Sequence, residues 1–250
     1  KGDDCMPYDI IIGRDKEDRE RYGDKGRIYL GKGYVKMGNY TSLSNILWLD
    51  VIKSHVILIA GKRGSGKSYS IGVLAEGLSK LPPEVKDNIA PLIFDTMGIF
   101  WTMKYRNDQD TELLEDWDLE AEELPANIWV PAGHYDEYAK RKIPVDRKFA
   151  LAANELDIED WLSIFELKMI EPVSVLIQKV VSNLSGNFDL NDIIENIRKD
   201  NDTLEEVKKS GIALFEAAKS WKVFATQGQE ATKINELIVA GTTSVLDLSV

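Results

Sequence analysis

The fold is decided by the stretch Gly61-Lys62-Arg63-Gly64-Ser65-Gly66-Lys67-Ser68, which matches the phosphate-binding pattern Gly-x-x-x-x-Gly-Lys-Ser. Glycines let the backbone curl so that successive N–H groups point at phosphates, which a side chain would obstruct. In this pattern the lysine reaches the β- and γ-phosphates of a nucleotide, and the serine offers its hydroxyl to Mg²⁺. We therefore predict that ATP and Mg²⁺ bind through Gly61, Lys62, Arg63, Gly64, Ser65, Gly66, Lys67, Ser68 and Tyr69.

The sequence on either side of the loop supports this prediction, because the pattern requires a strand before it and a helix after it. Residues 56–60, Val-Ile-Leu-Ile-Ala, form a continuous apolar run that is typical of a central parallel strand buried on both faces. The following segment carries a helical apolar face and is stopped by Pro82 and Pro83. The N-terminus of that helix would add free N–H groups and a dipole that favours phosphate.

The rest of the chain predicts an α/β fold with a mainly parallel sheet, a helical subregion and a short N-terminal β segment. Further buried strands are expected at residues 91–95, 128–130 and 243–250. Residues 157–220 carry four amphipathic stripes, and Asp157 and Asp189 are placed to cap two of these helices. The expected divisions are a β-rich segment at 1–50, a core at 51–250, and the helical subregion at 150–222 within that core.

Residues 1–50 contain short β-like pieces at 10–12, 27–30 and 46–50. The charged run from Asp15 to Arg21 is interpreted as solvated, and the spacing of Gly31 and Gly33 as turns. The acidic residues between 107 and 124 are likewise interpreted as a solvated excursion at the surface.

Hydrolysis requires more than a phosphate loop. A strand-end Asp usually holds Mg²⁺ through water, and a following Glu activates the attacking water. Asp95 and Asp247 end predicted strands, but neither is followed by Glu. We assign Lys67 and Asp95 as catalytic, and Ser68 and Asp95 as metal-binding. The alternative is that Asp95 caps the turn around Gly98.

The composition limits the remaining choices. A formal net charge of −11 argues against a chain that coats DNA by bulk electrostatics, although it leaves room for a local basic path. Cys5 is the only cysteine, so an internal disulfide and a cysteine-built zinc site are excluded. The longest apolar run, His55 to Gly61, is too short to span a membrane and no signal peptide is evident, so we expect a cytoplasmic protein. Structural roles are expected for His55 and His134, and both chain ends look cut.

Three stretches resemble the HerA-like branch of the HerA/FtsK ATPases. They are the block from His55 to Leu78, the element Asp95-Thr-Met-Gly-Ile-Phe-Trp101, and Ile234–Val250 with its Val-Leu-Asp-Leu-Ser strand. The resemblance covers residues from about 45 to 250. It implies a RecA-like ATPase that assembles into a homo-hexamer and moves along double-stranded DNA, with relatives that act beside a NurA-type nuclease or in anti-phage systems.

The resemblance also implies a Walker B strand with an Asp-Glu pair after the Leu-Asp-Leu-Ser strand. We therefore expect the core to be truncated before that strand, and residues 1–50 to hold only part of the family's N-terminal β-barrel. DNA would meet the densest basic cluster, in an expected loop around Pro144, although a plain solvated face is the alternative. This cluster consists of Lys140, Arg141, Lys142, Arg147 and Lys148, of which Arg141 or Arg147 could be an arginine finger.

The predicted function is thus an ATP-binding and ATP-hydrolysing motor subunit of a HerA-like DNA translocase or helicase. One alternative is an ATP-dependent switch or assembly protein without brisk turnover, which the missing Asp-Glu pair favours if Val250 is the true terminus. The other is a P-loop phosphotransferase, which would usually carry an arginine-rich lid that residues 105–150 lack.

Overall fold

The structure, a computed structural model, describes residues 9–37 and 40–249, so Cys5 and Val250 lie outside the described residues. The chain divides into two compact units. One contains Lys1–Asp95, Ile99–Asn127 and Ile238–Val245, and the other contains Thr96–Gly98, Ile128–Leu237 and Leu246–Val250.

The N-terminal part forms a three-stranded sheet. Strands β1 (Ile10–Ile12), β2 (Arg27–Met37) and β3 (Tyr40–Asp50) lie in the order β1-β3-β2, with β1 parallel and β2 antiparallel to β3. The predicted β pieces are confirmed, and two of them are longer than expected. The prediction of turns at Gly31 and Gly33 is wrong, because both glycines lie within β2, where the pairing register shifts as in a β-bulge.

The charged run is a helix, α1 (Lys16–Tyr22), which begins where the Asp15 side chain accepts a hydrogen bond from the backbone N–H of Asp18 at 2.8 Å. Only part of this run is solvated, since Asp18 is buried. The prediction of a wholly solvated segment is therefore wrong at this residue.

Helix α2 (Lys67–Ser79) follows the glycine-rich loop, and the short helix α3 (Pro83–Lys86) follows it directly. A small core joins α2 to the N-terminal sheet, with Ile28, Leu49 and Leu81 buried at its centre. Gly77 allows the close approach, because a Cβ at this position would lie 2.9 Å from the Cβ of Ile28. The predicted helix and its end before the two prolines are confirmed.

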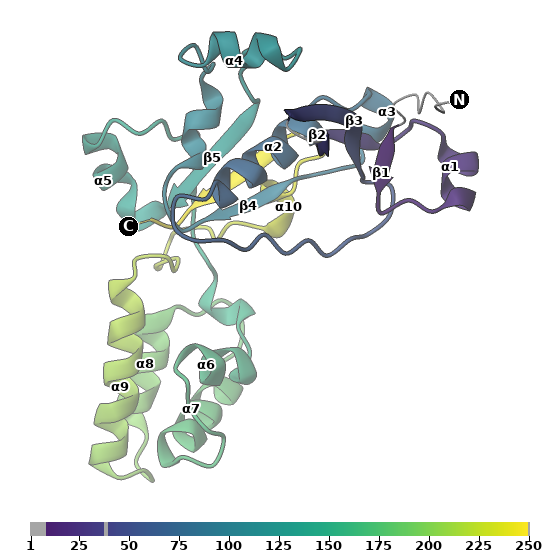
Figure 1. Cartoon of the computed structure of the whole chain (residues 1–250). Coiled ribbons are helices and arrows are strands. Elements are labelled where there is room, and N and C mark those ends of the chain that lie inside the picture. The colour runs from purple at the N-terminus through teal and green to yellow at the C-terminus, as the bar shows by residue number, and fades with distance from the viewer. Residues whose placement is uncertain (1–8, 38–39, 250) are drawn as a thin grey trace, which may run out of the picture. The chain divides into compact units, whose positions relative to one another are not determined.

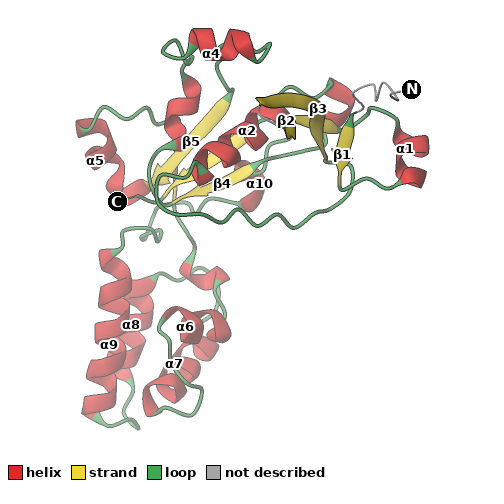
Figure 2. Cartoon of the chain, in the orientation of Figure 1, coloured by secondary structure: helices red, strands yellow, loops and turns green. Residues whose placement is uncertain are grey.

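The predicted central strand at residues 56–60 is wrong. These residues form no regular secondary structure, and Val56 and Leu58 are 103% and 89% exposed. Figure 2 draws the segment between β3 and α2 as a long loop. A strand needs a neighbour for its ladder of hydrogen bonds, and no described segment pairs with this one.

A four-stranded parallel sheet has the order β4-β7-β5-β6. Its strands are β4 (Leu92–Asp95), β7 (Thr243–Asp247), β5 (Ala126–Pro131) and β6 (Arg147–Phe149). All five residues of β7 are buried, as expected for a strand between two neighbours, whereas β4 lies at an edge and leaves Phe94 65% exposed. The α/β fold with a parallel sheet is confirmed, although β6 was not predicted and β4 is less buried than expected.

The helical subregion contains α6 (Ile158–Ile164), α7 (Pro172–Asn183), α8 (Leu190–Lys199) and α9 (Glu205–Ser220), grouped in Figure 1. Both predicted caps are confirmed, because Asp157 and Asp189 each form a capping box with the third helical residue. Trp161, Ile177, Ile193 and Phe215 are fully buried in its core.

The remaining short elements are the 3₁₀ turns Phe100–Lys104, Ala132–His134 and Ala153–Glu155, and the helices α4 (Thr111–Asp116), α5 (Tyr135–Lys140) and α10 (Ile234–Leu237). Helix α4 lies in the acidic stretch, whose residues are mostly exposed, as predicted. No helix among the described residues combines the length and the apolar character needed to cross a bilayer.

Candidate nucleotide-binding site

Two glycines of the glycine-rich loop have a backbone conformation that favours glycine. Gly64 and Gly66 adopt φ values of 77° and 85°, in the left-handed region that residues with a Cβ rarely adopt. Gly66 is also the N-cap of α2, and no atom lies within 4 Å of the position that its Cβ would occupy. The loop is therefore curled, and it is open beside Gly64 and Gly66.

The backbone donors of this loop are available to a ligand. A 3.2 Å hydrogen bond from the N–H of Ser65 to the carbonyl of Lys62 closes the turn. Within the described chain, the N–H groups of Gly64, Gly66 and Lys67 donate to no protein acceptor. Exposed donors at the start of a 13-residue helix provide the environment that phosphate oxygens require.

Lys67 lies across this turn. Its Nζ donates a 2.7 Å hydrogen bond to the carbonyl oxygen of Lys62, so the ammonium group is held beside the free backbone donors. Ser68 follows in the first turn of α2 and is half-buried, whereas Tyr69 is 69% exposed. The Lys67 ammonium group, three free N–H groups and the Ser68 hydroxyl lie close together in the sequence, and they fit a polyphosphate with its Mg²⁺.

The side chain of Asp95 is hydrogen-bonded to the backbone of the turn that follows it. The carboxylate is buried, and Oδ2 accepts hydrogen bonds from the N–H of Ile99 at 2.7 Å and of Phe100 at 2.8 Å. These bonds are the capping role that the sequence left open as the alternative. An additional metal-binding or catalytic role for Asp95 stays a prediction.

The turn after Asp95 also explains the glycine of the Asp-x-x-Gly element. Gly98 has a φ of 65°, and a Cβ at this position would lie 2.4 Å from Oγ of Ser249. Nearby, the Oδ1 atom of Asp247 accepts bonds from the Tyr138 hydroxyl at 2.8 Å and from the N–H of Ser249 at 3.0 Å. Burial raises the pKa of the Tyr138 hydroxyl, so this group stays protonated and continues to donate to Asp247.

The prediction that the basic cluster lies in a loop around Pro144 is only partly correct. Lys140 ends α5 and Lys142 follows it, whereas Arg147 and Lys148 lie on β6. The Arg147 guanidinium lies 5.4 Å from the ring centroid of Trp129, and Lys148 Nζ lies 3.6 Å from that of Tyr135. All five basic residues of the cluster are exposed, but two of them rest on aromatic rings.

A comparison with models of protein families identifies the family of the chain. Residues 35–249 match the model described as the central domain of helicase HerA. The chain belongs to this HerA central-domain family. The resemblance seen in the sequence is confirmed, and membership places the chain among the P-loop ATPases. Comparisons with curated proteins and with solved structures give no match.

Sequence reasoning missed a polar network in the N-terminal part of the chain, in which the buried pair Arg14 and Asp50 is connected to His55. The structural role expected for His55 agrees with its position. The feature of the sequence that could have indicated this network is Asp50, a charged residue at the end of a predicted strand and five residues before His55. His134 also contacts a carboxylate, with Nδ1 3.1 Å from Glu137.

Proposed function

We propose that this chain binds ATP with Mg²⁺ through residues 61–69 and hydrolyses it as a motor subunit. The observation that carries the proposal is the loop itself, where free N–H groups and the Lys67 ammonium meet at the N-terminus of α2. Backbone donors would hold the phosphates, Lys67 would neutralise their charge, and the Ser68 hydroxyl would meet the metal ion. Mg²⁺ would neutralise the charge that develops on the phosphates during transfer.

The work that hydrolysis drives is proposed to be translocation along double-stranded DNA by a homo-hexamer. Membership of the HerA family supports this, and the exposed basic cluster around Lys140–Lys142 offers phosphate contacts. A NurA-type nuclease or another effector as partner, a cytoplasmic location, and a motor core that extends over residues 51–250 belong to the same proposal.

A switch or assembly protein with slow turnover is the second candidate. It is favoured by Asp95, because two backbone N–H groups already occupy one of its carboxylate oxygens and no Glu follows it. The two candidates differ in turnover, since both require ATP to bind in the same loop.

The first experiment measures ATP affinity with Lys67→Ala, and Lys62→Ala serves as the control that removes the same charge from the same loop. Lys67→Ala should abolish measurable binding, whereas Lys62→Ala should retain most of it, because Lys62 contributes its backbone carbonyl. Unchanged affinity in Lys67→Ala would overturn the assignment of the loop.

The second experiment measures the ATPase rate of the assembled protein with and without duplex DNA. Stimulation by DNA would support the motor. A protein that binds ATP tightly, yet turns it over slowly and without response to DNA, would support the switch instead.

A further inference from the structure

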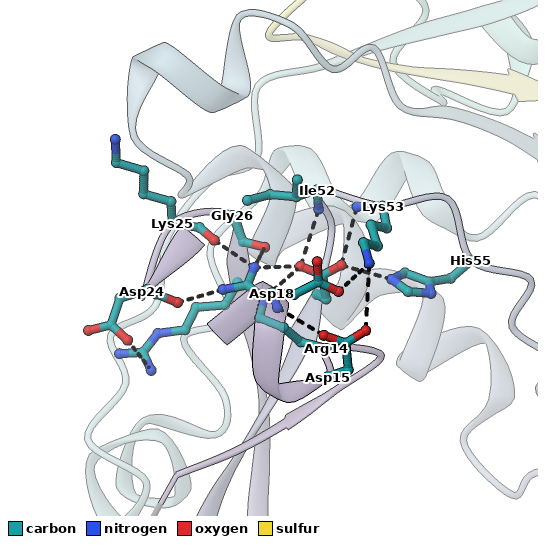
Figure 3. A network of polar contacts seen from close by, with 12 residues as sticks. Arg14, Asp15, Asp18, Asp24, Lys25, Gly26, Ile52, Lys53 and His55 are labelled. Atoms are coloured by element: carbon teal, nitrogen blue, oxygen red, sulfur yellow. Dashed lines mark hydrogen bonds and ion pairs between the residues drawn. The ribbon is translucent and has the colours of Figure 1, made fainter. Parts of the chain in front are cut away.

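We propose that Arg14, Asp50 and His55 are positioning residues that fix the segment leading into the phosphate-binding loop, and thereby set its affinity for nucleotide. This inference rests on the proposed function, because it concerns the same loop. All three residues and the loop belong to one compact unit of the chain. Figure 3 shows the network from close by.

Arg14 is the buried centre of the network, and its side chain is inaccessible to solvent. Nε donates to Oδ1 of Asp50 at 3.0 Å, and Nη2 also contacts this oxygen. The remaining donors reach backbone carbonyls of Gly23 at 2.6 Å, Lys25 at 2.7 Å and Gly26 at 3.2 Å. A guanidinium with all its nitrogens engaged is held rigidly, and it fixes the carboxylate with which it pairs.

Asp50 is the last residue of β3, and it connects the sheet to the chain that leaves it. Its Oδ2 accepts from the N–H of Lys53 at 3.2 Å and lies 3.0 Å from Nε2 of His55. Burial alone would raise the pKa of Asp50, but the hydrogen bonds from Arg14 and His55 hold it below its usual value. The carboxylate is therefore charged and has partners on both oxygens, which a buried charge requires.

Two further contacts hold the segment from Asp50 to His55 in place. The Lys53 ammonium reaches the buried Asp18 of α1. The His55 ring covers Gly13, where a Cβ would lie only 2.7 Å from Cε1. Gly13 has a φ of 86°, so both its backbone and its contact with the ring favour glycine. The His55 ring is thus held between the Asp50 carboxylate and Gly13, an arrangement that we call the His55 clamp.

His55 is the last fixed point before the loop. Within the described chain, residues 56–60 form no hydrogen bonds. On the far side, α2 packs through Gly77 against Ile28 of the same sheet. The phosphate-binding loop is therefore attached to one platform at both ends, by the His55 clamp before it and by α2 after it.

The test compares ATP affinity in His55→Leu, which cannot hydrogen-bond, and His55→Gln, which keeps an N–H donor. His134→Leu is the matched control, because it removes the other histidine that contacts a carboxylate, in the other unit. His55→Leu should weaken binding about tenfold, which matches one lost hydrogen bond to a charged group, and His55→Gln should recover most of it. Equal affinities of His55→Leu and the unaltered protein would overturn the inference.

A second readout needs no nucleotide. Trypsin cleavage after Lys62 and Arg63 should be several-fold faster in His55→Leu, while cleavage after the exposed Lys142 stays unchanged. If His55→Leu does not fold, His55→Phe keeps a ring beside Gly13 but loses the hydrogen bond to Asp50, and should have the same effects. A protein that binds no ATP would contradict the proposed function, and the cleavage rates would still decide whether the clamp exists.

Discussion

Gly66 adopts a φ of 85° immediately before α2, and a residue with a Cβ reaches this conformation at a cost of about 1–2 kcal/mol. A Cβ there would meet no neighbouring atom, so the backbone alone opposes substitution. We expect Gly66→Ala to weaken ATP binding strongly, because relaxing φ turns the free N–H groups away from the phosphates. Isothermal titration with ATP and Mg²⁺ measures the effect.

Gly186 offers a matched control for this prediction. It has a φ of 76°, has no atom near its Cβ position, and lies outside the loop. Gly186→Ala should cost similar stability and leave ATP affinity unchanged. Equal losses of affinity in both variants would mean that general destabilisation, not the shape of the loop, weakens binding.

Individual residues of the loop could be predicted because they are contiguous and each has a role defined by its place in the pattern. The Arg14–Asp50 pair could not, since 36 residues separate its members and only the folded β1-β3-β2 sheet brings them together. For Asp95, one feature could be predicted and another could not. Its position at a strand end was predictable, but its two bonds to the following turn depend on a backbone conformation that requires Gly98.

Helix α2 contains two glycines in different surroundings. Gly77 packs against Ile28, whereas a Cβ at Gly72 would have its nearest neighbour, the methyl carbon of Met103, 4.0 Å away. Alanine stabilises a helix interior by about 0.5–1 kcal/mol relative to glycine. Gly72→Ala should therefore raise the free energy of unfolding by this amount, and Gly77→Ala should lower it because its methyl group collides with Ile28.

Chemical denaturation of the two variants measures this difference. In an Ile28→Ala background the loss caused by Gly77→Ala should be smaller, because the Ile28 carbons that would lie 3.3 and 3.4 Å from the new methyl group are gone and the two sites are coupled. Stabilisation of the same size by both single substitutions would show that α2 does not pack closely against β2, and would remove one of the two attachments of the loop.

At the level of elements, helices were predicted well because periodicity and capping are local. The predicted strand at 56–60 failed because an apolar run indicates burial, whereas a strand also needs a neighbour. The bulges at Gly31 and Gly33 were mistaken for turns because glycine marks both features. Strand β6 has only three residues and two of them are charged, so its sequence carries no β pattern.

At the scale of the whole molecule, the distribution of charge limits where DNA could bind. The net charge of −11 repels a polyanion, so binding must rely on a local basic surface. Lys140, Arg141 and Lys142 are exposed and do not rest on aromatic rings, which makes them the available phosphate contacts of the cluster. Three contacts give a plot of log affinity against log salt a slope of about −2.7. Replacing all three with Gln should remove that part of the slope and weaken binding uniformly across DNA sequences.

Replacing Lys16, Arg19 and Arg21 of α1 with Gln is the control, because it changes the net charge by the same amount in another place. If the basic cluster binds DNA, only the first triple variant should flatten the salt dependence, as fluorescence anisotropy at several salt concentrations would show. Equal effects of the two variants would mean that DNA responds to overall charge alone. In that case the cluster is a solvated face, and translocation would need a DNA-contacting surface elsewhere in the assembly.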